Sequence, residues 1–298
     1  MDTSQQRHEL EATGWQRGLY DDIKRTFRAP IVNWIFRTAL ANEPAVTRYA
    51  WGQVKPVFET RAFARFTVEY RDAVLSALDV PATVTRYRPA DLGLDPTAYR
   101  ELRGQLATYD VVGPRLAVLF ETMDCGLHGR LDPEPPDDRA VTAPFPETLD
   151  RDRGRSPTLV DAVPDEIGET TAAIRAFHGL GDQLPSIYRT LGQWPGALET
   201  VWADLDPRFE SDDFDDACEA VATRVDAFVD DIPYTPRLAP ADLEALFDED
   251  AVTDLQELFR EFNTGPVETV LPTLPVFAAT VDAEGARSFP VDPRTDTA

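Results

Sequence analysis

The chain has 298 residues, of which 43% are hydrophobic, enough to bury the core of one large domain or two modest ones. It carries 53 Asp and Glu residues against 29 Lys and Arg residues, for a net charge of −24. So negative a surface disfavours nucleic acids and anionic membranes, and neither is expected as a partner.

The distribution of charge indicates the solvent in which the protein works. The charged residues are interspersed with apolar ones, which excludes a disordered acidic tail. Among the basic residues only Lys24 and Lys55 are lysines. A well-solvated acidic surface with few lysines suits a protein in concentrated salt, and we therefore expect a halophilic source.

The sequence shows no targeting segment and no cofactor motif. No apolar run approaches the ~20 residues that span a bilayer, and the polar residues 1–17 do not resemble a signal peptide, so we predict a cytoplasmic protein. Cys125 and Cys218 form no metal-binding pattern and are expected to be reduced. The three histidines lie far apart, and no phosphate-binding glycine loop is present. We therefore predict neither a metal nor a cofactor.

Helical periodicity recurs along the chain and strand patterns are scarce, so the sequence predicts an all-α fold. Between 132 and 157 the chain is dense in Pro, Asp and Arg, which indicates an extended, exposed linker. The segment 266–277 is apolar and interrupted by prolines. The predicted helices, in chain order, are 21–28, 31–42, 44–53, 61–78, 96–109, 114–123, 163–178, two that meet at Trp194–Pro195, 212–228, 240–247 and 252–262.

The spacing of prolines and tryptophans indicates a long internal repeat. Three residues, Pro, Trp and Pro, occur with spacings of seven and five, and the same pattern recurs 151 positions later. Further matches at an offset of 152 place Ile35–Thr38 over Ile187–Thr190 and Gly113–Pro114 over Gly265–Pro266. The repeated Pro-Trp-Pro residues are Pro44, Trp51 and Pro56 in the first copy and Pro195, Trp202 and Pro207 in the second.

Each copy of the repeat predicts a helix, a sharp corner and a second helix. Proline restricts the residue before it, so Trp194 should end one helix and Pro195 should begin the next. Trp51 and Trp202 fall within helices and are expected to pack in the core. We predict a first helical repeat at 1–130, a linker at 131–157 and a second repeat at 158–298, which together form a pseudo-dimer.

The segments that carry these features resemble the group I 2-haloacid dehalogenases, which act on both D- and L-substrates and are also called the halocarboxylic acid dehydrogenase family. The resemblance implies an all-helical pseudo-dimer with a buried pocket between the repeats. It also implies hydrolysis by a water that an aspartate activates, without a covalent ester and without a cofactor. The resembling segments are 28–51, 109–123, 159–162 and 185–199, and the Trp194–Pro195 corner and the Gly113–Pro114 turn are their best markers.

The family's catalytic base falls in an Ala-Ser-Asp run that matches Pro185, Ser186 and Ile187 here. The serine is kept, whereas Ile187 stands where the family has its aspartate. An isoleucine cannot accept a proton, and general-base catalysis contributes roughly 10²–10⁴-fold. The family mechanism therefore lacks its base at this position.

The other pocket positions of the family are also changed. Its asparagine falls on Gly113, and a nearby tyrosine falls on Leu116. Its aromatic pair falls on Ile31, where the ring is lost, and on Trp34, where it is kept. The resemblance thus places Ile31, Trp34, Gly113, Leu116, Ser186 and Ile187 around the ligand.

Two interpretations follow. In the first, the chain is a divergent hydrolase with a substitute base, either Asp110, close to the Gly113 turn, or Asp182, about one helical turn before Ser186. In the second, the protein is inactive and has a binding or structural role. Either way the expected partner is a small ligand, such as a short carboxylic acid, and a homodimer is possible.

Overall fold

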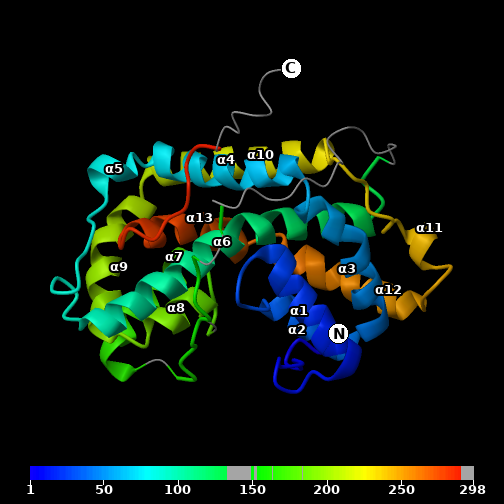
Figure 1. The fold of residues 1–298 in the computed structure, drawn as a ribbon, viewed down its shortest axis with the longest axis horizontal. Helices are drawn as coiled ribbons and strands as arrows, with labels where there is room; N and C mark the ends of the chain where they lie inside the picture. The colour runs from blue at the N-terminus through cyan, green and yellow to red at the C-terminus, as the bar shows by residue number, and fades with distance from the viewer. Residues whose placement is uncertain (133–148, 151–152, 163, 183, 290–298) are drawn as a thin grey trace.

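The computed structural model describes residues 1–132, 149–150, 153–162, 164–182 and 184–289, and all of its regular elements are helical (Figure 1). Within these residues no β-strand is formed, so the predicted all-α fold is confirmed. No helix in the described part of the chain is both long enough and apolar enough to cross a bilayer.

The helices follow one another with short connections in each half of the chain. The first half contains α1 (Gly14–Phe27), α2 (Trp34–Asn42), α3 (Pro44–Phe58), α4 (Arg61–Ala77), α5 (Val80–Thr83) and α6 (Pro96–Leu127). The second half contains a 3-10 turn (Asp165–Ile167), α7 (Gly168–Phe177), α8 (Ser186–Leu191), α9 (Pro195–Phe209), α10 (Asp212–Asp230), α11 (Pro240–Leu243), α12 (Glu249–Phe262) and α13 (Pro266–Ala279).

Local chemistry explains where several helices begin. Pro195 occupies the first position of α9 and Trp194 immediately precedes it, as the corner predicted. A proline is well placed there because the first amide of a helix has no partner within the helix. Asp95 caps α6 because its Oδ1 accepts from the amides of Thr97 and Ala98, at 2.7 and 3.0 Å. Such caps satisfy donors that the helix itself leaves open.

The central helix differs from the prediction. We expected two helices, 96–109 and 114–123, joined at Val112–Gly113, but α6 runs unbroken for 32 residues with Pro114 inside it. Proline removes one amide donor and normally breaks a helix. Here α6 is buried over most of its length and packs against α12, α13, α10 and α4, and this packing outweighs the lost hydrogen bond.

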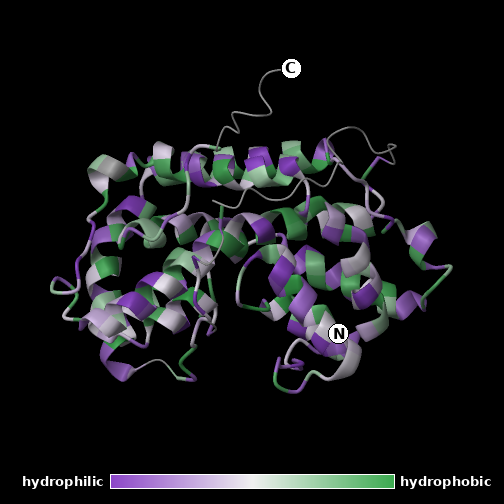
Figure 2. Cartoon of the chain, in the orientation of Figure 1, coloured by the Kyte–Doolittle hydropathy of each residue, from purple (hydrophilic) through white to green (hydrophobic). Residues whose placement is uncertain are grey.

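Helices α4 and α10 lie side by side across one face of the molecule (Figure 1). In Figure 2 hydrophilic and hydrophobic residues alternate along both of them. Their buried residues, Phe63, Phe66 and Tyr70 on α4 and Phe214 and Val221 on α10, recur at helical spacing. One stripe of each helix therefore faces the core, as the predicted amphipathic patterns require.

Two similar aromatic clusters fill the core. Trp51 stacks near Phe58, with ring centroids 6.3 Å apart, and Phe58 meets Phe63 at 4.9 Å. Trp202 packs on Phe209, with ring centroids 5.8 Å apart, and Phe209 meets Phe214 at 4.9 Å. Both tryptophans are buried, so the prediction that they pack in the core is confirmed.

The linker prediction holds only in part. Leu149 and Asp150 are 2% and 3% exposed, so this part of the predicted 132–157 linker is packed against the protein. Asp150 is drawn inward because its carboxylate pairs with the buried Arg115, with Oδ2 and Nη2 2.9 Å apart. Residues 133–148 and 151–152 of that linker lie outside the described residues.

Buried His178 connects three helices and makes stability depend on pH. It follows α7, and its Nδ1 and Nε2 lie 2.8 Å from Thr269 Oγ1 on α13 and 2.6 Å from the Tyr188 hydroxyl on α8. Burial lowers the pKa of His178 to about 4, whereas an unfolded histidine titrates near ~6.5. The unfolded state therefore takes up a proton first as the pH falls.

We expect this histidine to remove stability as the pH falls from about 6.5 to 4, by up to ~3 kcal/mol. Urea unfolding at pH 7 and pH 4.5 should show that His178→Gln loses less stability on acidification than the unmodified protein does. His8→Gln, at an exposed position, serves as the control. Equal acid sensitivity of the His178→Gln variant and the unmodified protein would contradict this assignment.

Candidate functional site

A cavity of ≈ 1280 Å³ lies among α2, α6, α8 and α13. Five of the six ligand-binding positions predicted by resemblance line it, and so does Asp182. These five come from segments up to 156 positions apart in the sequence, which the fold brings to one place. They are Ile31, Trp34, Leu116, Ser186 and Ile187.

The inner wall of the cavity is apolar. Leu116 and Val112 come from α6, Leu271 and Leu274 from α13, and Ile187 from α8. Ile187 is 1% exposed, so a carboxylate in its place would be buried among these groups. This wall offers van der Waals contact to a short aliphatic chain and no group that accepts a proton.

A polar group faces this wall. Tyr109 of α6 is buried, and its hydroxyl lies 2.8 Å from Thr190 Oγ1. Burial raises the pKa of Tyr109 to about 12, although Thr190, Ser186 and the charges of Arg189 and Arg37 act in the opposite direction. Tyr109 therefore stays protonated at neutral pH and can donate a hydrogen bond.

Arg37 and Arg189 bring positive charge to the same cavity. The Arg189 side chain is held by the carbonyl of Val160, which accepts from Nε at 3.1 Å and from Nη2 at 2.9 Å. Arg37 Nε is buried and has no hydrogen-bond partner within the described residues. Burial lowers the pKa of Arg37, and the charge of Arg189 lowers it further.

The carboxylates that line the cavity lie at its rim. All four are exposed to solvent, so none of them is buried against the apolar wall. Asp182, one of the two predicted substitute bases, is one of these rim residues. The four rim carboxylates are Asp161, Asp165, Asp182 and Glu261.

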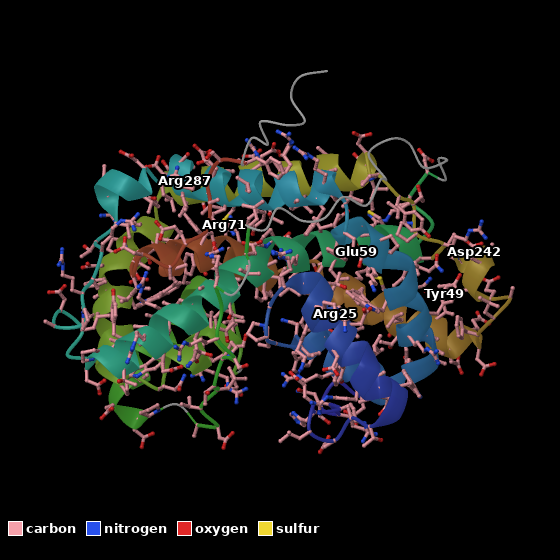
Figure 3. The ribbon with its side chains drawn as sticks, in the orientation of Figure 1. Arg25, Tyr49, Glu59, Arg71, Asp242 and Arg287 are labelled. Atoms are coloured by element: carbon pink, nitrogen blue, oxygen red, sulfur yellow. The ribbon has the colours of Figure 1, made fainter. Side chains whose placement is uncertain are left out.

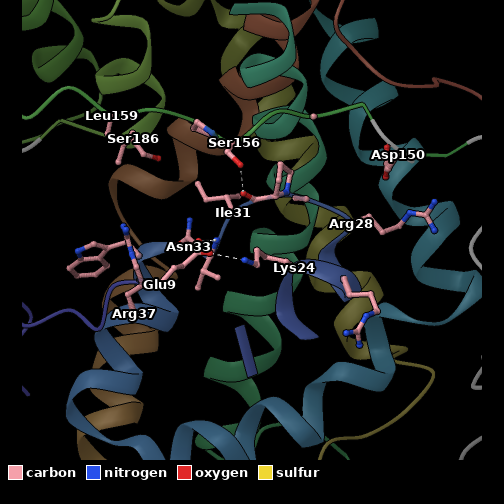
Figure 4. A pocket seen from close by; sticks show the side chains of 17 residues that line it. Glu9, Lys24, Arg28, Ile31, Asn33, Arg37, Asp150, Ser156, Leu159 and Ser186 are labelled. Carbon is pink, nitrogen blue, oxygen red and sulfur yellow. Dashed lines mark hydrogen bonds and ion pairs between the residues drawn. The ribbon is translucent and has the colours of Figure 1, made fainter. Parts of the chain in front are cut away.

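A second opening, of ≈ 1070 Å³, shares Ile31, Trp34, Arg37 and Ser186 with the cavity. Figure 4 shows Arg37 on one side of it, with Ser186 on the other side. Its lining also includes basic residues, among them Lys24, Arg25 and Arg28. Glu9 and Asp150 line it as well, and Lys24 and Arg25 are paired with Glu9 and Asp22, at 2.7 and 3.2 Å, so much of this positive charge is compensated.

The helical architecture around this cavity has known counterparts. A solved structure of a mutant D-2-haloacid dehalogenase in complex with D-2-CPA superposes with a TM-score of 0.76, covering 91% of this chain and 94% of that one at 21% identity. The structure of D-2-haloacid dehalogenase with L-LA gives a TM-score of 0.70 at 20% identity, over 91% and 94% of the two chains. The chain has the D-2-haloacid dehalogenase fold.

Sequence comparison points the same way over part of the chain. Residues 30–164 match the family model described as halocarboxylic acid dehydrogenase DehI. The (R)-2-haloacid dehalogenase of Pseudomonas putida is 35% identical over 80 residues, which are 27% of this chain and 26% of that protein. The matched segment thus spans about a quarter of that curated relative.

Asp110, the other predicted substitute base, does not line this cavity. It is 1% exposed and belongs to a buried ionic network between α4 and α6. Arg71 Nε donates to both of its oxygens, at 2.8 and 2.9 Å, and Arg153 Nη2 donates to Oδ2 at 2.7 Å. Figure 3 places Arg71 in the interior near α6. Both oxygens are therefore occupied, which argues for a structural role.

Asp150 and the C-terminal segment complete the network. Asp150 binds Arg115 and Arg153, at 2.9 and 2.8 Å. Burial would raise the pKa of Asp150, but Arg115, Arg71 and Arg153 lower it to about 2. The amide of Gly285 also donates to Asp110 Oδ2, at 3.0 Å. A Cβ at Gly285 would lie 2.2 Å from Arg153 Nη1 and 2.7 Å from Arg71 Cζ, so a side chain there would displace the guanidinium groups that bind Asp110.

Gly113 does not line the cavity but supports its wall. A Cβ on Gly113 would lie 3.4 Å from Leu274 Cδ1 and 3.7 Å from the carbonyl oxygen of Leu271, both at ordinary contact distance. Gly113 thus packs against α13 behind the Leu271 and Leu274 part of the wall, with room for a Cβ. No group of His, Cys, Asp and Glu suited to a metal ion occurs within the described residues.

Tyr109, Arg37 and Arg189 line the cavity but were not among the predicted site residues. A usable signal existed for the two arginines, because each interrupts an apolar helix start at the same place of the repeated stretches. No comparable signal marked Tyr109, which lies in a long buried helix where an aromatic residue is ordinary.

Proposed function

We propose that the chain binds a short carboxylic acid in this cavity and does not displace halide from it. The observation that carries the proposal is Ile187, which lines the cavity at the position where the resembled family has its base. Water attack on a carbon–halogen bond needs a group that accepts a proton. Among the described cavity residues, the carboxylates are all at the exposed rim.

The polar groups of the cavity support the binding half of the proposal. Arg37 and Arg189 supply charge-assisted donors for a carboxylate, and Tyr109 supplies a neutral donor. The wall formed by Leu116, Ile187 and α13 suits the aliphatic part of such a ligand. The solved relatives are named as complexes with D-2-CPA and with L-LA, and we extend only the class of small organic acid to this chain.

One observation favours an alternative function. Asp182 lines the cavity at its exposed rim and precedes Ser186 in the sequence, which supports it as the substitute base of a divergent haloacid hydrolase. Asp110 is a weaker candidate because its oxygens are bound by arginines. The assay below separates this hydrolase from the binding protein.

We expect the unmodified protein to release no halide from either enantiomer of 2-chloropropionate above the rate without protein. Both enantiomers are used because the resembled group acts on D- and L-acids. Halide release measured in high salt is the readout. Release well above background would contradict the proposal, and Asp182→Asn would then show whether Asp182 supplies the base.

Ile187→Asp, with or without Gly113→Asn, tests the missing base directly. If water reaches the new carboxylate, we expect halide release to rise by roughly 10²-fold or more over Ile187→Ala, the matched control. The variant should also be less stable, because a buried carboxylate without a partner is unfavourable and has a raised pKa. Melting curves must therefore accompany the assay. A folded Ile187→Asp variant without activity would mean that more than the base is missing.

We also propose that the two halves of the chain form a pseudo-dimer that arose by duplication. Helices α3 and α9 both contain 15 residues and begin with the matched prolines Pro44 and Pro195. The two aromatic clusters also match, because the Phe58–Phe63 and Phe209–Phe214 ring centroids are both 4.9 Å apart. The domain limits at 1–130 and 158–298, a halophilic source, a cytoplasmic location and a homodimer stay predictions.

A further inference from the structure

We propose that the ligand of the cavity is a short dicarboxylate, held with one carboxylate at Arg37 and the other at Arg189. This inference rests on the proposed function, because it names the class of acid that the same cavity binds. It starts from Arg37 and Arg189, two of the three arginines that line the cavity, and from the apolar residues of the same lining. The third, Arg175, donates through Nη2 to the backbone carbonyl of the rim residue Asp182, at 3.0 Å.

Arg37 has unused capacity to donate hydrogen bonds. It lines both the cavity and the second opening. Within the described residues its side chain makes no ion pair, and its Nε is buried without a partner. Leaving a buried charged donor unsatisfied is unfavourable, so an arginine in this state is prepared to bind an anion.

The nearest protein carboxylate does not neutralise Arg37. Glu9 lies close enough for its charge to act on Arg37, but its Oε2 binds Lys24 Nζ at 2.7 Å and its Oε1 accepts from the Val32 amide at 3.3 Å. The Glu9–Lys24 pair is locally neutral. The positive charge of Arg37 is therefore left for a ligand.

Arg189 is fixed in place while keeping its charge. Two of its nitrogens, Nε and Nη2, donate to the neutral carbonyl of Val160, which orients the guanidinium without compensating it. No carboxylate of the described residues forms an ion pair with Arg189, and the cavity carboxylates remain at the exposed rim. A second positive charge thus faces the cavity.

The positive charges of Arg37 and Arg189 together exceed the single negative charge of a monocarboxylate. They act on one another, since the charge of Arg189 lowers the pKa of Arg37. A ligand with one negative charge would leave one guanidinium uncompensated in a partly desolvated site, whereas two carboxylates match both. The site therefore selects against the monocarboxylates that a haloacid enzyme would bind.

The two arginines reach the cavity from two different helices. Arg37 on α2 and Arg189 on α8 occupy matched positions of the repeated sequence, three residues after Trp34 and three after Ser186. Ile187, Leu116 and Leu274 supply an apolar surface in the same cavity. A short methylene chain could pack there while a carboxylate extends toward each arginine.

The test compares succinate with butyrate, which has four carbons but a single carboxylate, by calorimetric titration at one fixed, high salt concentration. We expect succinate to bind about tenfold to hundredfold more tightly, because the second carboxylate gains a charge-assisted hydrogen bond. Arg37→Gln should abolish this preference while butyrate still binds. Arg189→Gln should do the same, and Arg224→Gln on the exposed face of α10 should leave it unchanged.

The outcomes separate this inference from the proposed function. Equal affinity for succinate and butyrate would overturn the dicarboxylate and leave the carboxylate-binding cavity standing. Inorganic phosphate binding more tightly than succinate would also overturn it, because both arginines would then converge on one group. If succinate, butyrate and phosphate all failed to bind, both the dicarboxylate ligand and the carboxylate-binding cavity would be overturned. Arg37→Gln removes no hydrogen bond within the described residues, so its fold should persist, and a melting curve checks this.

Discussion

Replacing Asp110 with asparagine is expected to lower the free energy of unfolding by about 3–5 kcal/mol, the usual effect of removing one partner of a buried ion pair. Asp110 and Arg71 are each 1% exposed, and the carboxylate binds Arg71, Arg153 and the amide of Gly285. The amide side chain of asparagine carries no charge, so Arg71 would keep its hydrogen bond to the neutral Ala286 carbonyl, at 2.8 Å, and an ion pair with the more distant Asp150, at 3.6 Å.

Urea unfolding at constant salt provides the measurement, since urea does not alter ionic screening. Asp72→Asn is the matched control, because Asp72 makes a surface pair with Arg287, with Oδ1 and Nε 2.8 Å apart. A surface pair contributes about 0–1 kcal/mol. If Asp110→Asn unfolded at the same urea concentration as the control but lost catalysis or binding, Asp110 would belong to the site after all.

Dialysis into dilute buffer is expected to remove most of the helical signal in circular dichroism. The net charge of −24 repels itself, and screening extends over about 10 Å at 0.1 M salt but only about 3 Å at 1 M. Neighbouring carboxylates on one helix are closer than 10 Å, so dilute salt leaves their repulsion largely in force. Refolding on return to molar salt should restore the signal.

The cause can be isolated with a solute and a variant. Sucrose favours the compact state without screening charge, so it should rescue the fold less well than KCl does. The substitutions Asp216→Asn and Glu219→Gln neutralise two exposed carboxylates of α10. They should lower the salt concentration at which half of the helical signal is lost. A protein equally stable in dilute buffer and in molar salt would refute the role of repulsion.

Local patterns in the sequence were sufficient to predict most helices. Proline at a helix start and the apolar spacing of 61–78 and 212–228 are short-range signals, and α4 and α10 lie where they indicated. Pro114 misled the prediction because the cost of a proline inside a helix is local, whereas the packing of α12 and α13 that outweighs it comes from distant segments.

The site was predictable only as far as resemblance reached. Ile31, Trp34 and Ile187 line the cavity, and only a family pattern had grouped them; their contact with a ligand stays a prediction. The role of Asp110 depends on partners many positions away, such as Arg71, 39 positions from it. Periodicity tells which face of a helix is buried, but it does not tell which buried faces meet.

The bond between Asp110 and Gly285 has a consequence for synthesis of the chain. The two residues are 175 positions apart, and Gly285 lies close to the C-terminus. At about 5–20 residues per second, the ribosome reaches Gly285 on the order of 10–35 s after Asp110. Until then the network around α6 lacks this partner, so the nascent chain cannot complete its core during translation of the first half. A chain that stops before Gly285 would therefore contain the early helices but lack the hydrogen bond from the Gly285 amide to the buried Asp110.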